Sequence, residues 1–418
     1  MAASLSRLND LVTSYGGKFV YIGVPEQYSM FRDLYPSFLN NNDELLSLTE
    51  SSFFSELETY GIDYIDMRRE FLQYGDYAGF YSKTDHHYNL FGAFYVYGVL
   101  TDKINGVLDA PLPVLTADDI DFVKLDNPFY GSRSRKLYNA YKTDDKLWYY
   151  TQKNPLPYVR TNNYDWAPTD IFALPVDDTS PVTYNLYMGG DIAETIIQTN
   201  RPELPDALIF GDSFTNPLET FLYQSFNETR SLDMRYYTDC TLLEYVQKYK
   251  PDYVFCERDD TAYLSFDGNG NIGVPVAVPV AQDVYVNGAE TAFGAYNING
   301  SVYFKLDDLA YALNGTRAQF SPVFDETGGA VTLTAGEPHL GAGYAPENKT
   351  ESVIPVPSAS RVYVGEVKPE NEMSVISYDI GGDKYFRLRD IGAALDFGVS
   401  WDAEKNAVII DTDERYKP

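Results

Sequence analysis

The sequence predicts an α/β fold, in which helices flank a parallel sheet, followed by a smaller α+β repeat domain. Three observations lead to this prediction. The first ninety residues alternate strand and helix patterns, as in proteins built on a parallel sheet. An apolar run at residues 207–210 then leads directly into a Gly-Asp-Ser turn at residues 211–213. Beyond residue 270 strand patterns dominate, and one sequence motif occurs twice.

The elements of the first part follow one another as strands and helices. Apolar runs of strand length indicate buried strands, and longer stretches with apolar residues at helical spacing indicate helices. After a first helix, the expected elements are a strand at residues 18–24, a helix at 51–60, a strand at 62–67 and an apolar helix at about 89–104. Later in the chain we expect a strand at 207–210, helices at about 217–226 and 241–249, and a strand at 253–256.

Residues 105–205 are rich in Pro, Asp, Asn and Tyr and have no sustained period. We expect short strands and loops over the active-site face here, rather than an independent domain. Within this segment, Gly189 and Gly190 form a pair that marks a tight turn or a close approach of the backbone to a ligand.

The chain is expected to have three parts. Residues 1–265 would form the α/β domain, residues 266–282 a linker, and residues 283–413 the repeat domain. The linker contains the sequence VPVAVPV, whose prolines make it stiff.

The repeat aligns residues 298–310 with residues 380–392, at an offset of 82 residues. Each copy is expected to form a hairpin, a short helix and a closing pair of strands. Between the copies, residues 336–360 are rich in Gly, Pro, Ser and Glu, and we expect a long flexible insertion there.

The composition argues against some partners. The chain has 61 acidic against 32 basic residues, and its net charge of −29 argues against nucleic acid or an anionic membrane, which need basic surface. No stretch approaches the ~20 apolar residues that span a bilayer. The two cysteines, Cys240 and Cys256, fit neither a disulfide framework nor a zinc site, and we expect them to be buried thiols.

Ser213 in the Gly-Asp-Ser turn is the first candidate nucleophile, because many α/β esterases present a serine at the carboxyl edge of a parallel sheet. A serine needs a base and a group that orients the base. Among only three histidines, His87 lies two residues after Asp85, and in an extended segment their side chains share a face. The carboxylate can fix the tautomer of the imidazole and leave the other ring nitrogen free to take the serine proton.

Two other interpretations of residues 85–87 stay open. These residues could cap the following helix, or they could begin a metal site in which Asp212 is a further ligand. The pairing with a Gly-Asp-Ser turn favours catalysis over the cap, and the lack of more candidate ligands disfavours the metal. His86 is expected on the opposite face from Asp85 and His87, as a structural hydrogen-bonding residue.

These motifs resemble those of the DHHW-type proteins, which are relatives of the SGNH hydrolase-like O-acetyltransferases that act in alginate acetylation. The resemblance rests on KTDHHY at residues 83–88 followed by Gly-Ala, on the strand that ends at Pro25, and on Gly-Asp-Ser-Phe at residues 211–214. It covers residues 10–265. It implies an SGNH-like fold with a permuted order, in which the Asp-x-His block precedes the Ser block, as it does in this chain.

The resemblance also implies a role for each of the three residues. Ser213 would be the nucleophile, His87 the base and Asp85 the residue that orients the base. Tyr88 stands where the name-giving tryptophan of the family usually lies, a departure that leaves the triad untouched. No cofactor and no metal are expected.

Further residues are candidates for substrate binding. The backbone N–H of Ser213 would be one oxyanion donor, and the glycine turn is a candidate for the second. Arg235 could bind an anionic or sugar group, or it could form a structural salt bridge. The candidate oxyanion or substrate-binding residues are Gly189, Gly190, Arg235, Asp212 and His86.

The second copy of the repeat is similar to the copper amine oxidase N-terminal-like (stalk) domain of bacterial surface proteins. The similarity lies in YFRLRDI at residues 385–391 and VSWD at residues 399–402, and the first copy matches less well. Copper needs imidazole or thiolate ligands, whereas residues 266–418 contain one histidine, His339, and no cysteine. We expect a spacer or binding module at the cell surface rather than a copper site.

The predicted function is that of an extracytoplasmic serine enzyme that transfers or removes O-acetyl groups on a cell-envelope polysaccharide through an acetyl-serine intermediate. The alternative is a non-catalytic cell-surface glycan-binding or scaffold protein, because a fold alone does not establish catalysis. The resemblance makes a membrane-bound O-acyltransferase a candidate acetyl donor. Family members usually begin with a membrane anchor or signal segment, so we expect that such a segment has been removed from this chain and that the full-length protein is membrane-anchored or at the cell surface.

Overall fold

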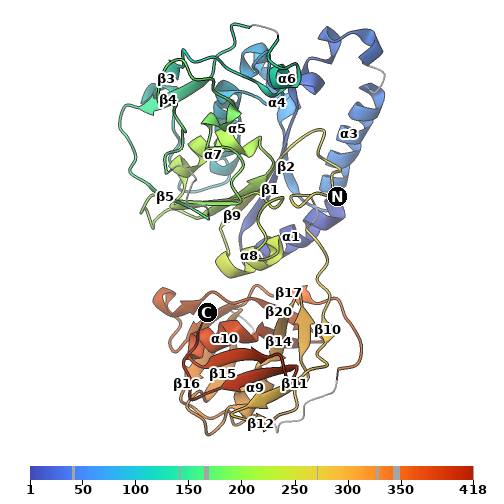
Figure 1. Cartoon of the computed structure of the whole chain (residues 1–418), viewed down its shortest axis with the longest axis vertical. Helices are drawn as coiled ribbons and strands as arrows, with labels where there is room; N and C mark the ends of the chain where they lie inside the picture. The colour runs from blue at the N-terminus through green and yellow to red at the C-terminus, as the bar shows by residue number, and fades with distance from the viewer. Residues whose placement is uncertain are drawn as a thin grey trace. The chain divides into compact units, whose positions relative to one another are not determined.

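The structure is a computed structural model that describes residues 1–39, 43–140, 143–163, 169–270, 272–325, 329–341 and 349–417. The chain divides into two compact units, which can be followed in Figure 1. The first unit comprises Met1–Cys240 and Pro251–Ile272, and the second comprises Thr241–Lys250 and Gly273–Pro418. The helix expected at residues 241–249 therefore groups with the second unit rather than with the first.

A seven-stranded sheet forms the centre of the first unit, in the order β2-β1-β9-β7-β8-β6-β5. Its strands are β1 (Lys18–Val24), β2 (Asp63–Asp66), β5 (Val159–Asn162), β6 (Glu194–Gln198), β7 (Ala207–Gly211), β8 (Glu228–Leu232) and β9 (Tyr253–Asp259). Neighbouring strands from β2 to β8 pair in parallel, whereas β6 and β5 continue the sheet as antiparallel strands. The α/β prediction is confirmed, in a sheet that is mixed rather than wholly parallel.

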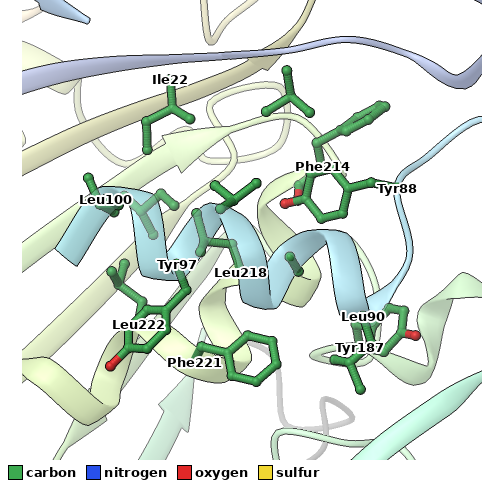
Figure 2. Packing of buried hydrophobic residues seen from close by; sticks show 14 of the residues in the cluster. Ile22, Tyr88, Leu90, Tyr97, Leu100, Tyr187, Phe214, Leu218, Phe221 and Leu222 are labelled. Atoms are coloured by element: carbon green, nitrogen blue, oxygen red, sulfur yellow. The ribbon is translucent and has the colours of Figure 1, made fainter. Parts of the chain in front are cut away.

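Helices pack on both faces of this sheet. The helices of this unit are α1 (Ala2–Ser14), α2 (Gln27–Met30), α3 (Asp43–Thr59), α4 (Met67–Tyr74), α5 (Leu90–Asn105), α6 (Ser132–Lys136) and α7 (Thr215–Leu222). Because side chains alternate along a strand, β1 contributes to two cores. Tyr21 packs on Phe53 of α3, whereas Ile22 belongs to the core that includes α5 and α7. Figure 2 shows this second core, with Ile22, Tyr97 and Leu100 beside Leu218, Phe221 and Leu222 of α7.

The start of α5 matters for the site, because residues 85–87 immediately precede it. The side chain of Asn89 caps this helix and accepts hydrogen bonds from the N–H groups of Phe91 at 2.9 Å and Gly92 at 3.2 Å. The helix is therefore capped by Asn89, and the capping interpretation of residues 85–87 is wrong.

Strand β8 was not expected from the sequence. Its sequence ETRSL contains no apolar run that would predict a strand. In the structure Glu228 and Arg230 pair with each other at 2.6 Å on one face, while Thr229 and Ser231 are buried on the other. Strands β5 and β6 were expected to lie over the active-site face, but they extend the main sheet instead. A separate two-stranded ribbon is formed by β3 (Ile120–Lys124) and β4 (Trp148–Gln152).

Two features related to the composition concern the membrane and the thiols. Among the described residues, no helix has the length and apolar character needed to cross a membrane. Cys240 and Cys256 are both thiols, of which Cys256 is fully buried in β9 and Cys240 is only partly buried.

The second unit contains α8 (Leu242–Tyr249) and two copies of one motif. The first copy comprises β13 (Tyr296–Ile298), β14 (Ser301–Lys305), α9 (Leu306–Ala312), β15 (Phe320–Asp325) and β16 (Ala330–Ala335). The second copy comprises β20 (Ser377–Ile380), β21 (Asp383–Arg387), α10 (Leu388–Leu395), β22 (Gly398–Asp402) and β23 (Ala407–Asp411). Each copy is a hairpin, a short helix and a second hairpin, which is the order that the repeat predicts.

The two copies interlock. Strand β11 (Asp283–Val286) precedes the first copy and pairs with β23 of the second, whereas β18 (Arg361–Val364) precedes the second copy and pairs with β16 of the first. The remaining strands are β10 (Val278–Pro279), β12 (Ala289–Glu290), β17 (Val356–Pro357) and β19 (Glu372–Met373). Because β10 and β17 pair at the edges of a six-stranded sheet, parts of the expected linker and of the expected insertion belong to the fold. Residues 342–348 of that insertion lie outside the described residues.

Candidate active site

Ser213 lies in the turn between β7 and α7, at the carboxyl end of a strand in the middle of the sheet. The carboxylate of Asp212 accepts a hydrogen bond from the N–H of Phe214 at 3.0 Å. The backbone carbonyl of Asp212 accepts one from the N–H of Thr215, also at 3.0 Å. These two bonds fix the turn in which the serine stands. The Ser213 residue is only partly buried, so part of its surface is open to solvent.

Three predicted residues meet in one hydrogen-bonded chain. Nε2 of His87 lies 2.7 Å from Oγ of Ser213, and Nδ1 of His87 lies 2.6 Å from Oδ1 of Asp85. An ionised carboxylate can only accept, so Nδ1 carries the imidazole proton and Nε2 is left to accept the proton of the serine. This tautomer is the one that a general base for Ser213 requires.

The carboxylate of Asp85 is buried and held by the backbone. Oδ1 also accepts a hydrogen bond from the N–H of His87 at 3.1 Å, and Oδ2 accepts one from the N–H of Ser132 at 2.7 Å. Burial by itself raises the pKa of Asp85, but the hydrogen bonds from His87 and Ser132 outweigh it and hold the pKa below its ordinary value. The carboxylate therefore stays ionised beside the imidazole at neutral pH.

Aromatic rings fix the plane of the His87 imidazole. The Tyr184 ring stacks on it with 3.9 Å between the ring centroids and 8° between the planes. The Phe214 ring lies 4.8 Å away at 55°, and the Tyr184 hydroxyl donates to the carbonyl of Tyr88 at 3.2 Å. Sequence reasoning missed Tyr184, and nothing distinguishes it within a chain that contains 37 tyrosines.

His86 lies beside His87 rather than on the opposite face. The centroids of the two rings are 3.7 Å apart, because the chain bends at residues 86 and 87 instead of continuing the expected extended segment. Nδ1 of His86 is 2.6 Å from Oγ of Ser132, and the N–H of His86 donates to the same oxygen at 3.2 Å. Burial and the neighbouring His87 lower the pKa of His86 to about 4, so this ring is neutral at pH 7.

Asp85, His86 and His87 also form the group in the described part of the chain whose geometry could hold a metal ion, with one ligand atom from each within 4.8 Å of the others. Asp212, which was expected as a further ligand, is not part of it. Both oxygens of Asp85 and both ring nitrogens of His87 already take part in hydrogen bonds. The donor set therefore fits a proton-transfer triad better than a metal centre.

Two backbone N–H groups are candidates for binding an oxyanion, that of Ser213 and one from the glycine turn at residues 189–190. Across the described residues, the N–H of Ser213 has no hydrogen-bond acceptor. Gly189 and Gly190 form the predicted tight turn, with φ of 84° and 97°, but the N–H of Gly190 donates to the carbonyl of Tyr187 at 3.0 Å. Of the glycine pair, the N–H of Gly189 is therefore the one left to donate.

The glycine turn is tied to the helix that follows the nucleophile. Asp191, the next residue after the turn, accepts a hydrogen bond from Nδ2 of Asn216 in α7 at 3.1 Å. Its other oxygen lies 3.2 Å from Nη2 of Arg235, which also contacts Asp233 at 2.6 Å. The guanidinium of Arg235 is thus engaged by two carboxylates, as the salt-bridge interpretation predicts.

Asp212 faces the interior rather than the substrate side. It is buried, Oδ2 accepts a hydrogen bond from the N–H of Asp259 at 3.2 Å, and Nε of Arg258 lies 3.8 Å from the same oxygen. Burial and the charge of Asp259 raise the pKa of Asp212 well above its ordinary value. These contacts make Asp212 a residue that shapes the turn around Ser213.

No family model matches the chain, and no curated protein matches it. Several solved structures do. PatB1 from Bacillus cereus, in a structure with a sulfonyl adduct, is 22% identical with a TM-score of 0.52, and the match covers 63% of this chain and 87% of PatB1. A DHHW family protein from Eubacterium siraeum is 17% identical with a TM-score of 0.50, and the match covers 65% of this chain and 87% of that protein.

A third similar structure, the O-acetyltransferase domain of Pseudomonas putida AlgJ, is 14% identical over 64% of this chain and 83% of that domain. Its TM-score of 0.39 is too low to establish a shared fold. At such identities, the likeness to the first two proteins concerns the fold and not the chemistry. The chain thus has a mixed α/β fold similar to that of PatB1 and of the DHHW family protein.

Proposed function

We propose that this protein is a serine enzyme that transfers or removes O-acetyl groups on a cell-envelope polysaccharide through an acetyl-Ser213 intermediate. One observation carries the proposal. The hydrogen-bonded chain from Asp85 through His87 to Ser213, with distances of 2.6 and 2.7 Å, supports these roles, because acyl transfer needs an orienting carboxylate, a base and a nucleophile in this order.

In the first half of the reaction, Oγ of Ser213 attacks the carbonyl carbon of an acetyl ester while Nε2 of His87 takes the hydroxyl proton. Asp85 stabilises the imidazolium that forms, without accepting its proton. The oxyanion of the tetrahedral intermediate would be held by the N–H of Ser213 and the N–H of Gly189. Removal of one such donor costs about 10²–10³-fold in kcat in a serine protease.

The intermediate then collapses and expels the alcohol, which takes the proton back from His87. In the second half, His87 removes a proton from a sugar hydroxyl or from water, and this oxygen attacks the acetyl-serine carbonyl. The second tetrahedral intermediate then collapses, the bond between the acetyl carbon and Oγ of Ser213 breaks, and Oγ takes the proton from His87. A sugar hydroxyl as the attacking group gives acetyl transfer, and water gives ester hydrolysis.

The choice of acetyl chemistry is supported by the motif resemblance and by the fold likeness to a DHHW family protein. PatB1 forms a sulfonyl adduct, and sulfonyl reagents react with activated serines. As finer parts of the proposal, the first unit is an SGNH-like domain of permuted order, the second is a stalk-type surface module, and the full-length protein works outside the cytoplasm with a membrane-bound O-acyltransferase as acetyl donor.

A second function, glycan binding without catalysis, is favoured by one observation. A cavity of about 900 Å³ runs along α5 and is lined by aromatic rings, among them Tyr74, Phe91, Phe94 and Tyr95, and by the acidic residues Glu70, Asp76 and Asp102. Mostly apolar, aromatic-lined cavities with a few polar groups are typical binding sites for small ligands. A protein of this kind would bind oligosaccharides without turning over esters.

Hydrolysis of an aryl acetate separates the two functions. The enzyme proposal predicts turnover by the wild type that is lost in Ser213→Ala and in His87→Ala, and kept in two matched controls, Ser51→Ala on α3 and His339→Ala in the second unit. No turnover together with no fluorophosphonate labelling of the wild type would leave glycan binding as the better account. An oligosaccharide acceptor, followed by mass spectrometry of its acetylated product, then distinguishes transferase from esterase.

A further inference from the structure

The hydroxyl of Tyr88 contacts two oxygen atoms, one of them in the residue that follows Ser213. The hydroxyl of Tyr88 lies 2.5 Å from the carbonyl oxygen of Phe214 and 2.7 Å from Oε1 of Glu257 in β9. Tyr88 directly follows the base, His87, and Phe214 directly follows the nucleophile, Ser213. The Tyr88 hydroxyl therefore joins the segment that carries the base to the segment that carries the nucleophile.

The protons available for these two contacts can be counted. A carbonyl oxygen can only accept, and a phenol has one proton to donate. Both distances are hydrogen-bond distances for a pair of oxygens, so each contact needs a proton between its atoms. The proton of Tyr88 serves the carbonyl of Phe214, and the proton in the other contact has to come from Glu257.

An ionised Glu257 would not satisfy this arrangement. In one of the two contacts, at 2.5 or 2.7 Å, two oxygen atoms would then face each other with no proton between them. The surroundings also disfavour the charge, because Glu257 is fully buried and its Oε2 has no hydrogen-bond partner among the described residues.

The groups around Glu257 add no compensating charge. The titratable neighbours are Tyr88, Tyr184, Asp212, Glu219 and Cys256, of which Asp212 and Glu219 are acids. Burial raises the pKa of Glu257 well above its ordinary value and the charges of Asp212 and Glu219 raise it further, whereas a hydrogen bond donated by Tyr88 to an ionised Glu257 would lower it.

We propose that Glu257 is a neutral carboxylic acid whose proton is donated to Tyr88, so that Tyr88 in turn holds the carbonyl of Phe214. Glu257 is then a positioning residue for Ser213, because the relay sets the turn of the nucleophile relative to the loop of the base. The inference rests on the proposed function in so far as its kinetic readout is turnover at Ser213.

Three variants test the relay. In Glu257→Gln the side-chain amide donates to Tyr88 as the acid does, but it cannot ionise. In Glu257→Met the donor is lost at similar volume, and in Tyr88→Phe the hydroxyl between the two segments is lost. Turnover of an aryl acetate is measured for each protein from neutral to alkaline pH, together with the unfolding midpoint Tm.

The relay predicts that Glu257→Gln retains a kcat close to wild type at neutral pH. The wild-type kcat falls at alkaline pH as Glu257 loses its proton, and the Gln variant lacks this fall. Glu257→Met and Tyr88→Phe lose about 10–100-fold in kcat with little change in KM, because small displacements at a reacting centre have effects of this size. A Gln variant as impaired as the Met variant, or one with the alkaline profile of the wild type, would overturn the proposal.

Two measurements keep the test independent of catalysis. The pKa of Glu257 is raised in the folded protein, so the folded state keeps this proton as pH rises past the ordinary glutamate pKa, whereas the unfolded state loses it. The wild type therefore loses stability relative to Glu257→Gln as pH rises. The infrared difference between these two proteins should contain the C=O band of a protonated carboxylic acid. If that band is present but no turnover occurs, the proposed function fails and the protonation of Glu257 stands. If the band is absent, the inference itself is wrong.

Discussion

Gly131 offers a direct way to disturb the triad without touching any of its members. This residue precedes Ser132, whose N–H holds Oδ2 of Asp85. A Cβ atom added at Gly131 would lie 2.3 Å from the carbonyl oxygen of Thr84 and 2.5 Å from its carbonyl carbon. Since real Cβ contacts are essentially never under 3.0 Å, Gly131→Ala forces the two backbones apart by at least 0.7 Å.

Among the hydrogen bonds between the two segments, that displacement acts most directly on two. The N–H of Ser132 donates to Asp85 at 2.7 Å, and the N–H of Arg133 donates to the carbonyl of Thr84 at 3.0 Å. Loss of one bond to a buried carboxylate and one neutral bond costs about 2–4 kcal/mol of unfolding free energy. Because Asp85 and His87 shift relative to Ser213, kcat should fall by about 10–100-fold in the protein that remains folded.

The assay is aryl acetate turnover well below the unfolding midpoint, combined with denaturant unfolding. Gly79→Ala is the matched control, because an added Cβ at Gly79 meets nothing within 4 Å. The control should change neither quantity. If Gly131→Ala retained the stability and the kcat of the wild type, the backbone of residues 131–132 would not support Asp85, and the reasoning from close packing would be refuted.

Three further predictions concern residues around the triad. Burial lowers the pKa of His86 from its ordinary 6.5 to about 4, so the folded protein resists protonation of this ring. The wild type should therefore lose stability relative to His86→Gln as pH falls from 6.5 to about 4. If the unfolding midpoints of the two proteins changed in parallel in acid, this prediction would be wrong. Tyr184→Phe keeps the ring stacked on His87 and should lower the free energy of unfolding by about 1 kcal/mol. Tyr184→Ala should lower it by about 3–5 kcal/mol and also reduce kcat, which unfolding and turnover measurements would show. Arg235→Gln should lower stability and leave KM for the aryl acetate unchanged, because its guanidinium is engaged by Asp191 and Asp233; a raised KM would instead assign it to substrate binding.

The parts of the site that the sequence predicted are those whose signal is local. An apolar run that leads into Gly-Asp-Ser predicted the turn of Ser213, and Asp85-x-His87 predicted a carboxylate beside an imidazole. The structure brings these side chains together across 126 residues, while their catalytic roles stay predictions. The apolar run at residues 18–24 predicted β1 with its bounds, because the side chains of this strand are buried on both faces.

The parts that were missed depend on contacts between distant segments. Ser132, Tyr184 and Glu257 act through bonds or ring contacts to residues far away in the sequence, and no local pattern marks them. His86 was placed on the wrong face because an extended backbone was assumed where the chain bends. β8 was missed because ion pairing, rather than an apolar run, satisfies one of its faces.

Trapping the acyl-enzyme tests the role of Ser213 as nucleophile directly. Wild-type protein is mixed with an aryl acetate, quenched in acid during turnover, digested and analysed by mass spectrometry. If Ser213 is the nucleophile, a single acetyl group is expected on the peptide that contains Ser213, and at Ser213 itself on fragmentation. No acetyl-enzyme is expected in Ser213→Ala, and a strongly reduced amount in His87→Ala. Turnover that persists in Ser213→Ala, or an acetyl group carried by another residue during wild-type turnover, would contradict this role.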